Sequence, residues 1–342
     1  MMRCPLCFAL THSPLYRRYQ RCQLCALAFI PDATALPPIE TYHAADGSYY
    51  FPNSNNLISR VAGRAFLAGR NAKILFSPVS VRMFAGREGY RVIDLRTSLP
   101  FPPLYAHWPF GHRLRAELEL RLPITGKIES RLSLGVIAAA TAFDDLRALW
   151  ADMAGLAARM VVVVDSADPQ LAAIWQENLG VYGAALVVAH PLAGDFAAQR
   201  NRVQALCQTP FILQLDCDET LSAGAKRILP ELIDEAQASG FSAIGLPRIN
   251  EVDGTIAALY PDVQYRLLRK EVRFTRAVHE YPDLAAGQKS RVELGGAILH
   301  RLSSERFSTR EAFYEKIAKG AGRPEDGALL HEPLDPALPL PG

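Results

Sequence analysis

The sequence predicts an α/β protein whose mostly parallel sheet is covered by helices on both faces. Short apolar, strand-like runs alternate with amphipathic segments between residues 132 and 239, which is the pattern of βαβ units. Of the 342 residues, 49% are hydrophobic and 21% are charged, as in ordinary folded proteins and unlike disordered chains. At about 150 residues per domain, this length predicts two domains.

The expected strands and helices follow one another along the second half of the chain. In such a sheet, ligands bind beyond the carboxyl ends of the strands, where Asp165, Asp216 and Asp218 stand. The expected elements are, in chain order, a strand at 132–140, a helix at 143–157, a strand at 160–166, a helix at 171–180, a strand at 184–190, a helix at 195–206, a strand at 211–219 and a helix at 223–239.

Charge and hydropathy exclude two classes of protein. Lys+Arg is 37 and Asp+Glu is 35, so the net charge of +2 lacks the clustered positive charge of a nucleic-acid-binding protein. The longest apolar runs, at 134–143 and 160–164, are too short to span a bilayer. The first residues, MMRCPLC, contain no apolar segment of a secretory signal, so we expect a cytoplasmic protein.

Four of the six cysteines lie in the first 25 residues with the spacing C-x2-C-x14-C-x2-C. A gap of two residues lets both thiolates of a pair reach one ion, and four thiolates suit a closed, structural Zn²⁺ site. Disulfides are the alternative, which a reducing cytosol disfavours. The proposed zinc ligands are Cys4, Cys7, Cys22 and Cys25, whereas Cys207 and Cys217 have no partners at this spacing and are expected in the core.

The segment around and after these cysteines resembles a class I S-adenosylmethionine methyltransferase. The text CPLC…RCQLCALAFIPDATALPPIETYHAADGSYYF is similar to the zinc-ribbon leader of that family, and residues 52–97 are similar to the far end of its domain. There we expect a strand, a helix and a strand that close a sheet, at 73–76, 78–88 and 90–95. No G-x-G-x-G loop follows a strand in residues 30–125, so we expect no S-adenosylmethionine binding and only a packing or docking role.

The sharpest chemical signal is the segment FILQLDCDETLS at 211–222. A buried strand runs into acids, and alternate residues of an extended segment point the same way. Asp216 and Asp218 can therefore converge on Mg²⁺ or Mn²⁺, which would neutralise a diphosphate leaving group. The alternative is an acidic turn that caps the helix at 222–237.

Five segments follow one another in residues 131–318: VVVVDS, GDFAAQRN, FILQLDCDETL, YPDVQYRLLRK and RAVHE. In this order and spacing they resemble bacterial family 2 glycosyltransferases of the GT-A fold, of the subgroup that acts in lipopolysaccharide-core and related surface-glycan assembly. The resemblance implies a metal-dependent, inverting transfer from a nucleotide-sugar donor to a glycan or lipid-linked acceptor in cell-surface polysaccharide assembly. It also implies a peripheral membrane or protein partner at the inner face of the cell membrane.

The resemblance assigns the nucleotide side of the site. Asp165, Asp195 and Arg200 would hold the base and ribose, with Asn201 as a supporting neighbour. Asp216 and Asp218 would bind diphosphate and metal, with Asp218 as the more direct ligand. For Arg200 the alternative is an exposed charge on a helix.

The resemblance also assigns the diphosphate and acceptor side. Gln264 and Arg266 alternate on one strand face, with Arg269 nearby, and would contact diphosphate or acceptor, since a guanidinium grips phosphate with two hydrogen bonds. An ordinary polar strand face is the alternative for these residues.

The segment RAVHEYP places a histidine and a glutamate where this family has its base. Glu280 would remove the proton of the acceptor hydroxyl as that oxygen attacks the anomeric carbon. His279 would assist there or contact metal or phosphate, and a solvated loop pair is the alternative. His300 would serve the diphosphate or metal, with a satisfied core histidine as the alternative.

Three departures from the family leave a second class of function open. The first strand ends in Ala138–Thr141 where the family has an Asn-Glu pair, and Asp144 and Asp145 follow in the next helix. The loop SADP after Asp165 is short, although Asp168 can replace one acid. The proline-rich end suits an extended tail rather than an amphipathic helix. The alternative function is a non-catalytic binding or scaffold protein with degenerate transferase and methyltransferase folds.

These observations divide the chain into four parts. We expect a zinc ribbon at 1–45, a truncated methyltransferase-like α/β piece at 46–125, a GT-A domain at 126–320 and a Pro-rich tail at 321–342, with a linker at 121–130.

Overall fold

The chain forms two compact units, Met1–Leu122 and Pro123–Gly342. Their division falls inside the linker that the sequence predicts. The computed structural model describes residues 6, 12–16, 19–23, 28–29, 36, 49–52, 74–75, 78–88, 90–98, 113–120, 129–320, 323–336, 338 and 340–341.

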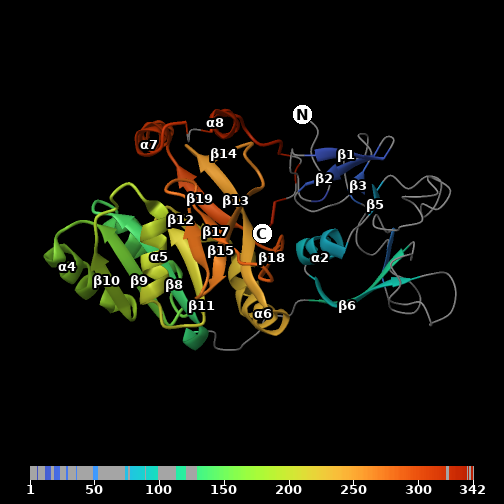
Figure 1. Cartoon of the computed structure of the whole chain (residues 1–342), viewed down its shortest axis with the longest axis horizontal. Helices are drawn as coiled ribbons and strands as arrows, with labels where there is room; N and C mark the ends of the chain where they lie inside the picture. The colour runs from blue at the N-terminus through green and yellow to red at the C-terminus, as the bar shows by residue number, and fades with distance from the viewer. Residues whose placement is uncertain are drawn as a thin grey trace. The chain divides into compact units, whose positions relative to one another are not determined.

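Four parallel strands form one half of the large sheet in the second unit (Figure 1). Their order is β10 (Ala185–Ala189), β9 (Arg159–Asp165), β8 (Leu132–Ala139) and β11 (Phe211–Asp216). The connections are α3 (Phe143–Asp152), α4 (Pro169–Leu179) with the short helix η5 (Gly180–Tyr182), and α5 (Phe196–Leu206), while η4 (Glu129–Arg131) precedes β8. The expected alternation and the α/β class are confirmed.

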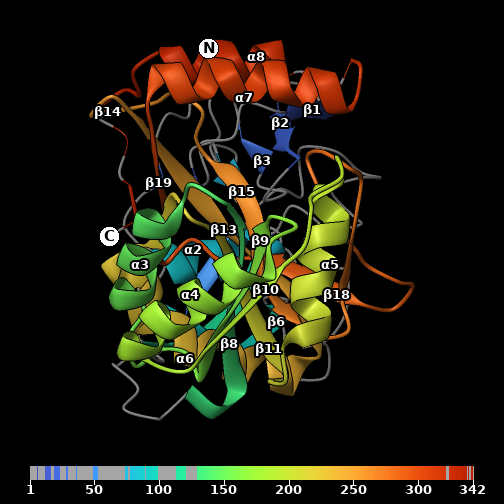
Figure 2. The ribbon, with the colours of Figure 1, turned by 90° about the vertical axis from the view of Figure 1, so that its left-hand side faces the viewer.

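Helices cover both faces of these strands, because successive strand residues point to opposite sides. Val162 and Val164 of β9 pack with Leu149 of α3 and Trp175 of α4, on the side that α6 (Ala223–Ser239) also covers. Val161 and Val163 pack on the other side with Val203 of α5. Figure 2 shows α3, α4 and α6 on one side of the strands and α5 on the other. A Cβ at Gly135 would lie 2.5 Å from Val203 Cγ1, so glycine permits the close approach of α5 to β8.

The other half of the sheet mixes strand directions. β15 (Asp262–Arg269) pairs antiparallel with both β11 and β13 (Phe241–Val252), and β19 (Ile298–Leu302) lies parallel to β13. β12 (Glu219–Leu221) pairs with β19, while β14 (Thr255–Ile256) and β18 (Lys289–Val292) pair with β13. A separate ribbon joins β16 (Arg273–Thr275) and β17 (Tyr281–Asp283).

The C-terminal part of the chain continues with α7 (Ser304–Ile317) and α8 (Pro324–His331), which lie across the same end of the sheet in Figures 1 and 2. The backbone N–H of Ala258 donates to the carbonyl of Glu332 at 2.7 Å, and that of Leu334 donates to Ile256 at 2.8 Å. The expectation of an extended tail is wrong for α8, because Pro324 occupies its first turn, where proline is compatible with a helix.

The first unit has two small sheets. One joins β1 (His12–Tyr16), β2 (Tyr19–Cys22), β3 (Ala28–Phe29) and β5 (Ile74–Leu75), and the other joins β4 (Tyr49–Pro52), β7 (Arg113–Leu120) and β6 (Tyr90–Ser98). The expected helix forms as α2 (Pro78–Arg87), which buries Val81, Met83 and Phe84. Because β5 and β6 belong to different sheets, the expected strand–helix–strand unit does not close one sheet here.

The zinc prediction lies outside the described residues. Cys4, Cys7 and Cys25 are not described, and of Cys22 the structure describes only the backbone, at the end of β2. The zinc ribbon therefore stays a prediction. No helix among the described residues is both long enough and apolar enough to cross a membrane.

Candidate functional site

A cavity of about 310 Å³, here called cavity A, opens at the carboxyl ends of β8 and β11. The end of β8 contributes Ala139 and Thr141, α3 contributes Asp145, and Asp216 and Asp218 come from the end of β11. Arg200 of α5, Glu280 and Tyr314 of α7 complete its polar wall. The position is the one that the strand-end rule predicts for a ligand in an α/β sheet.

Asp216 lies between two arginines. Its Oδ1 accepts from Arg200 Nη2 and its Oδ2 from Arg266 Nη2, both at 2.7 Å. The sequence predicts Asp216 as a cation ligand, but both carboxylate oxygens already have guanidinium partners. Asp216 therefore fixes the two arginines beside cavity A, and its metal-binding role stays a prediction.

Arg200 is a buried group, 1% exposed, so an exposed helix charge is excluded. Besides Asp216, it donates from Nε to Glu280 Oε1, and its Cζ lies 5.7 Å from the centre of the Phe274 ring. Burial and Arg266 oppose ionisation, but Asp216 and Glu280 outweigh them and raise the pKa of Arg200 above its usual value. The guanidinium stays charged within the protein interior.

These contacts belong to a longer chain of alternating charges. Arg266 Nη2 also donates to Glu219 Oε1 at 2.9 Å, and Arg248 Nη1 donates to the same oxygen at 2.9 Å. Burial opposes ionisation of Glu219, but Arg266 and Arg248 hold its pKa below the usual value. In order, the chain of ion pairs is Asp262, Arg248, Glu219, Arg266, Asp216, Arg200 and Glu280.

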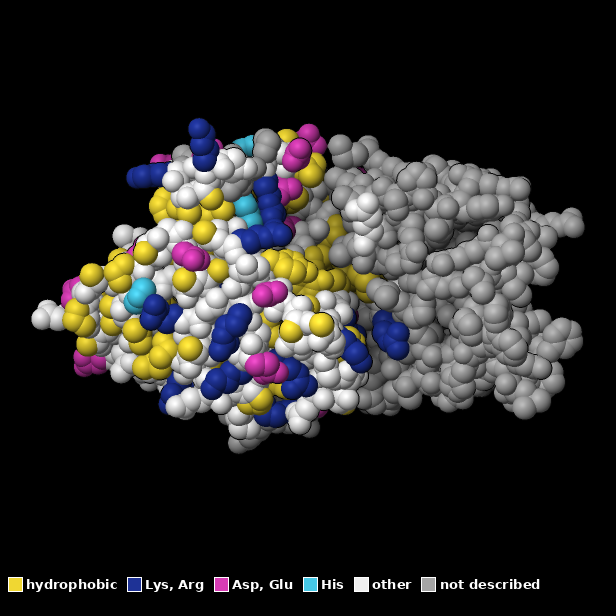
Figure 3. All heavy atoms as spheres, viewed as in Figure 1, with side chains coloured by type: hydrophobic (Ala, Val, Ile, Leu, Met, Phe, Trp, Pro, Cys, Tyr) yellow, Lys and Arg dark blue, Asp and Glu magenta, His cyan; other side chains and the backbone are white. Residues whose placement is uncertain are grey.

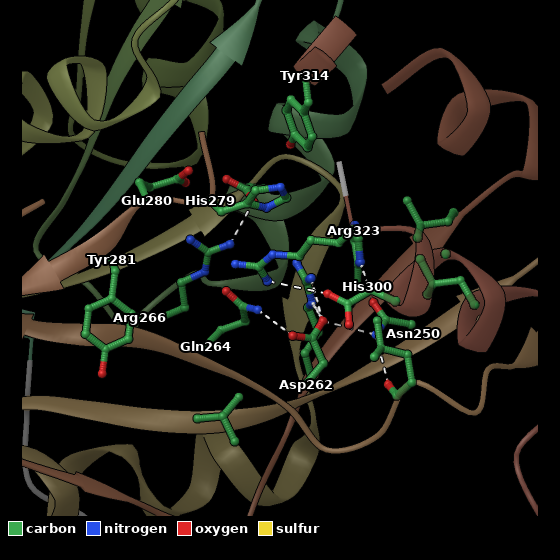
Figure 4. A pocket seen from close by; sticks show the side chains of 18 of the residues that line it. Asn250, Asp262, Gln264, Arg266, His279, Glu280, Tyr281, His300, Tyr314 and Arg323 are labelled. Carbon is green, nitrogen blue, oxygen red and sulfur yellow. Dashed lines mark hydrogen bonds and ion pairs between the residues drawn. The ribbon is translucent and has the colours of Figure 1, made fainter. Parts of the chain in front are cut away.

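A second cavity of about 240 Å³, here called cavity B, lies over the antiparallel half of the sheet. Its floor comes from strand faces, with Arg248 and Asn250 of β13, and Asp262, Gln264 and Arg266 of β15. In the view of Figure 4, Gln264 lies beside Asp262, His279 lies between Arg266 and Tyr314, and Tyr281 lies apart from Tyr314 at the other edge. Cavities A and B share Asp216, Glu280 and Tyr314.

Glu280 lies in this shared region, and its neighbour His279 lines cavity B. His279 has a φ of 51°, in the left-handed region that is uncommon for residues other than glycine, and its ring centre lies 5.3 Å from that of Tyr314. Glu280 is held by Arg200 through Oε1 and its side chain is 13% exposed. The carboxylate is thus fixed in a wall that both cavities reach.

His300 is buried and faces Asp218. Asn250 donates from Nδ2 to Leu259 and Asp262, so its Oδ1 accepts the proton of His300 Nδ1 at 2.8 Å. In the neutral form of the ring, Nε2 carries a lone pair; it lies 3.4 Å from Asp218 Oδ2 and has no hydrogen-bond partner among the described residues. Two acceptors that face each other in this way are suited to hold a cation between them.

Three of the predicted nucleotide residues make hydrogen bonds to the backbone, and their nucleotide role stays a prediction. Asp165 Oδ1 accepts from the backbone N–H of Leu192 at 2.8 Å, and Asp195 caps α5 by accepting from Ala198 at 2.9 Å. Asn201 exchanges hydrogen bonds with the backbone of Phe274. None of the three lines cavity A or cavity B.

The predicted strand residues separate into two groups. Gln264 and Arg266 line cavity B, where Gln264 Nε2 donates to Asp262 Oδ1 at 2.7 Å. Arg269 instead donates to the carbonyls of Phe241 and Ala236 near the end of α6 and lines neither cavity. The three residues do not act as one group.

Several site residues escaped the sequence analysis, among them Arg248, Asn250, Asp262 and Tyr314. Asp262 could have been predicted from the sequence, because it lies two residues before Gln264 and therefore on the same strand face. Arg248 had no local signal, since it meets Asp262 only through the register of β13 against β15. Tyr314 required the fold of α7 over the sheet edge.

The cysteines of the second unit are not paired with each other. Cys207 is buried, and burial raises the pKa of its thiol to about 11. Cys217 lines cavity A, where burial and Asp216 raise the pKa of its thiol above the usual value. The core position expected for Cys207 is confirmed.

Solved structures resemble part of this chain, at low identity. They include S. aureus TarS, with 13% identity and a TM-score of 0.34, where the match covers 58% of this chain and 42% of that chain. TarS 1–349 in complex with UDP gives 13% identity and a TM-score of 0.35 over 58% of this chain and 69% of that chain. TarS 1–349 in complex with UDP-GlcNAc gives 14% identity and a TM-score of 0.35, and the match covers 58% of this chain and 70% of that chain. The match thus spans less than half of the first TarS chain, and a similarity this low transfers no residue role.

No family model matches the sequence, and no curated protein matches it.

Proposed function

We propose that this chain is a metal-dependent, inverting glycosyltransferase that moves a sugar from a nucleotide-sugar donor to a glycan or lipid-linked acceptor in cell-surface polysaccharide assembly. The observation that carries the proposal is the position of Glu280 in the wall shared by cavities A and B. A transferase needs one base that reaches the acceptor while the donor occupies a neighbouring site.

Cavity A is the donor site in this proposal. It lies at the carboxyl ends of parallel strands, and Arg200 Nη1 has no hydrogen-bond partner among the described residues although it is buried. An unused guanidinium N–H next to a cavity suits a phosphate oxygen. Arg200 would orient the diphosphate, and Asp216 would keep Arg200 and Arg266 in place.

Asp218 and His300 are the residues of this chain that would hold Mg²⁺ or Mn²⁺. The described residues contain no cluster of three or more His, Cys, Asp or Glu suited to a metal. Two protein ligands still fit these cations, which take their other ligands from water and substrate phosphates. When bound, the cation supplies neutralisation of the diphosphate as it leaves.

Glu280 is the general base. Arg200 holds Oε1, and Oε2 has no partner that the described residues supply. The second oxygen can accept the proton of an acceptor hydroxyl as the oxygen of that hydroxyl attacks the anomeric carbon on the face opposite the diphosphate. Such a positioned base contributes typically about 10²–10⁴-fold to the rate.

A non-catalytic binding or scaffold role is the second candidate. The observation that favours it is the lining of cavity A at the end of β8, where Ala139, Thr141 and Ala142 stand in place of an Asn-Glu pair. The structural contacts of Asp165 and Asp195 also reduce the number of polar groups left for a nucleotide.

Nucleotide release and nucleotide binding distinguish the two candidates. The full chain is mixed with a panel of UDP-, GDP- and dTDP-sugars with and without Mn²⁺, and release of the nucleoside diphosphate is measured. A transferase releases the diphosphate from at least one donor, faster with Mn²⁺. Binding of nucleotide with no release from any donor, in the presence of glycan acceptors, would favour the scaffold.

A further inference from the structure

We propose that Arg200 is a positioning residue for Glu280: from α5 it fixes the carboxylate of the base, together with the segment 274–280 that carries this carboxylate. The role rests on the proposed function, because Glu280 acts as a base only if the chain transfers a sugar. It gives Arg200 a part in the proton-transfer step, beyond its contact with the donor. Three observations carry it: the attachment of the segment to α5, the burial of Arg200, and the directions of its N–H groups.

Backbone hydrogen bonds attach the segment 274–280 to α5. The N–H of Phe196 donates to the carbonyl of Ala277 at 2.9 Å. Further along the helix, Asn201 Nδ2 donates to the carbonyl of Phe274 at 2.9 Å, and the N–H of Phe274 donates to Asn201 Oδ1 at 2.7 Å. The position of the segment is therefore set by α5, a helix that also lines cavity A.

Glu280 needs support beyond this backbone attachment. The turn that precedes it contains Arg276 and His279 with φ of 73° and 51°, in the left-handed region that is uncommon for residues other than glycine. A glutamate side chain has three rotatable bonds, and ordering it costs side-chain entropy. Arg200 Nε donates to Glu280 Oε1, so the carboxylate is already ordered before an acceptor binds.

Arg200 differs from the cations on the surface of the second unit. Figure 3 shows Lys and Arg side chains spread over one face of this unit, where they are in contact with solvent. Arg200 is instead buried, with Phe274 packed on its guanidinium. Arginines are almost never fully buried unless they are paired, and here Asp216 and Glu280 supply the opposite charges. Because the guanidinium is shielded from solvent, these partners fix the direction of its N–H groups.

The N–H groups of Arg200 have three different roles. Nε faces Glu280, Nη2 faces Asp216, and Nη1 has no hydrogen-bond partner among the described residues and suits the donor diphosphate. A planar, rigid guanidinium fixes its partners relative to one another, whereas the ammonium of lysine is a point charge on a flexible stem. Arg200→Lys therefore keeps the positive charge and removes the directional hold on the base.

Arg266 provides a matched control for Arg200. Both arginines are buried, and both donate from Nη2 to Asp216 at 2.7 Å. The other partner of Arg266 is Glu219, and within the described part of the chain Arg266 makes no hydrogen bond with Glu280. Arg200→Lys and Arg266→Lys thus weaken similar buried ion pairs, but the first releases the base and the second does not.

The experiment is a double-mutant cycle on the full chain, in which Arg200→Lys is combined with Glu280→Gln. Release of nucleoside diphosphate is measured with Mn²⁺, with UDP-glucose, UDP-N-acetylglucosamine, GDP-mannose and dTDP-glucose as donors and p-nitrophenyl glycosides as acceptors. Arg200→Lys alone should lower kcat about ten- to hundredfold, because a misplacement of about 1 Å can cost 10²-fold. In the Glu280→Gln background the same change should lower kcat less than about twofold, since no base is left to position.

The donor KM and the matched control separate positioning from binding and from stability. Arg200→Lys should raise the donor KM by the same factor in both backgrounds, because the donor contact of Nη1 does not involve Glu280. Arg266→Lys combined with Glu280→Gln should give the product of the two single effects on kcat. The role of Arg200 is overturned if Arg200→Lys lowers kcat equally in both backgrounds, or if Arg266→Lys departs from the product as strongly as Arg200→Lys does.

Asn201→Ala serves as a second variant if Arg200→Lys does not fold. It keeps the charge of Arg200 but removes the hydrogen bonds that hold Phe274, so it should lower kcat with Glu280 present and not with Glu280→Gln. An equal loss of kcat in both backgrounds overturns the role. If the wild type releases no nucleoside diphosphate from any donor, the proposed function fails and the role falls with it, whereas transfer by the wild type with independent effects rejects the role of Arg200 alone.

Discussion

The two cavities differ in how the fold brings their residues together. Cavity A collects groups from the ends of parallel strands, such as Asp216 and Asp218, which lie two residues apart in the sequence. Cavity B collects groups from the faces of antiparallel strands and from the C-terminal segment, such as Arg248, Asp262 and Asp326. The comparison shows that a strand-end site is visible in local sequence, whereas a strand-face site depends on pairing register and on long-range packing.

Removing the centre of the ion-pair chain should have the largest effect on stability. Glu219 is fully buried between Arg248 and Arg266, so Glu219→Gln leaves one buried and one half-buried guanidinium group short of a negative charge. We expect the free energy of unfolding to fall by about 3–5 kcal/mol, measured from the midpoint and slope of denaturant unfolding.

The control for Glu219 is the exposed pair of Arg131 and Asp234. Asp234→Asn should cost less than about 1 kcal/mol, as exposed ion pairs do. If both variants lost the same free energy of unfolding, the chain of ion pairs would not stabilise the antiparallel half of the sheet.

The two acids that follow β11 in cavity A, Asp216 and Asp218, should differ in their response to metal. We expect Asp218→Asn to weaken Mn²⁺-dependent UDP binding by at least about tenfold, because Asp218 faces His300. Asp216→Asn should keep the Mn²⁺ dependence but lose stability, because Arg200 and Arg266 lose their shared partner. Calorimetric titration with and without Mn²⁺ measures both, and the reverse pattern would assign the metal to Asp216.

Acid should lower the stability of the antiparallel half of the sheet, because it protonates Asp262. Burial opposes its ionisation, but Arg248 outweighs burial and holds the pKa of Asp262 below the usual value. A carboxyl whose pKa is lowered by folding stabilises the protein above its unfolded pKa of about 3.9, and this stabilisation is lost as pH falls through the folded pKa. Asp262→Asn should therefore be less stable than wild type at pH 7, with the difference narrowing below about pH 4.

Unfolding curves collected between pH 7 and pH 3 test this dependence. A stability difference between wild type and Asp262→Asn that stays constant over this range would show that the ionisation of Asp262 is not linked to folding.

The smallest expected effect concerns Asp195. If Asp195 serves only as the N-cap of α5, Asp195→Ala should cost about 1 kcal/mol, the same as Asp168→Ala at the N-cap of α4. UDP binding should then be equal in the two variants. Weaker UDP binding in Asp195→Ala alone would restore the nucleotide role that the sequence predicts.

Sequence reasoning located the parallel half well, because its signals are local. The valine run of β9 alternates between two faces, and the acids after β11 follow a buried strand, so both could be placed without knowledge of the rest of the chain. Asp165 was found for the same reason, although its side chain accepts from the backbone N–H of Leu192. Position at a strand end does not decide which way a carboxylate turns. The role of Asp195 came from the resemblance of its segment to the glycosyltransferase family, and here it caps α5.

The site residues on the antiparallel half of the sheet could not be predicted in the same way. Arg248 meets Asp262 because β13 and β15 pair in one register, with an irregularity between Ile244 and Gly245 that shifts the rest of the strand. The proline content of the C-terminal segment predicts an extended tail, but Pro324 begins a helix. Both outcomes depend on packing between segments that lie far apart in the sequence.

The central claim is that Glu280 is the base between a donor and an acceptor, and Glu280→Gln tests it most directly. Glutamine keeps an oxygen for Arg200 but cannot take a proton, so donor binding should match wild type while sugar transfer falls by roughly 10²-fold or more. Asp283→Asn, at an exposed position in β17, is the control and should leave both unchanged. Transfer at the wild-type rate by Glu280→Gln would contradict the account.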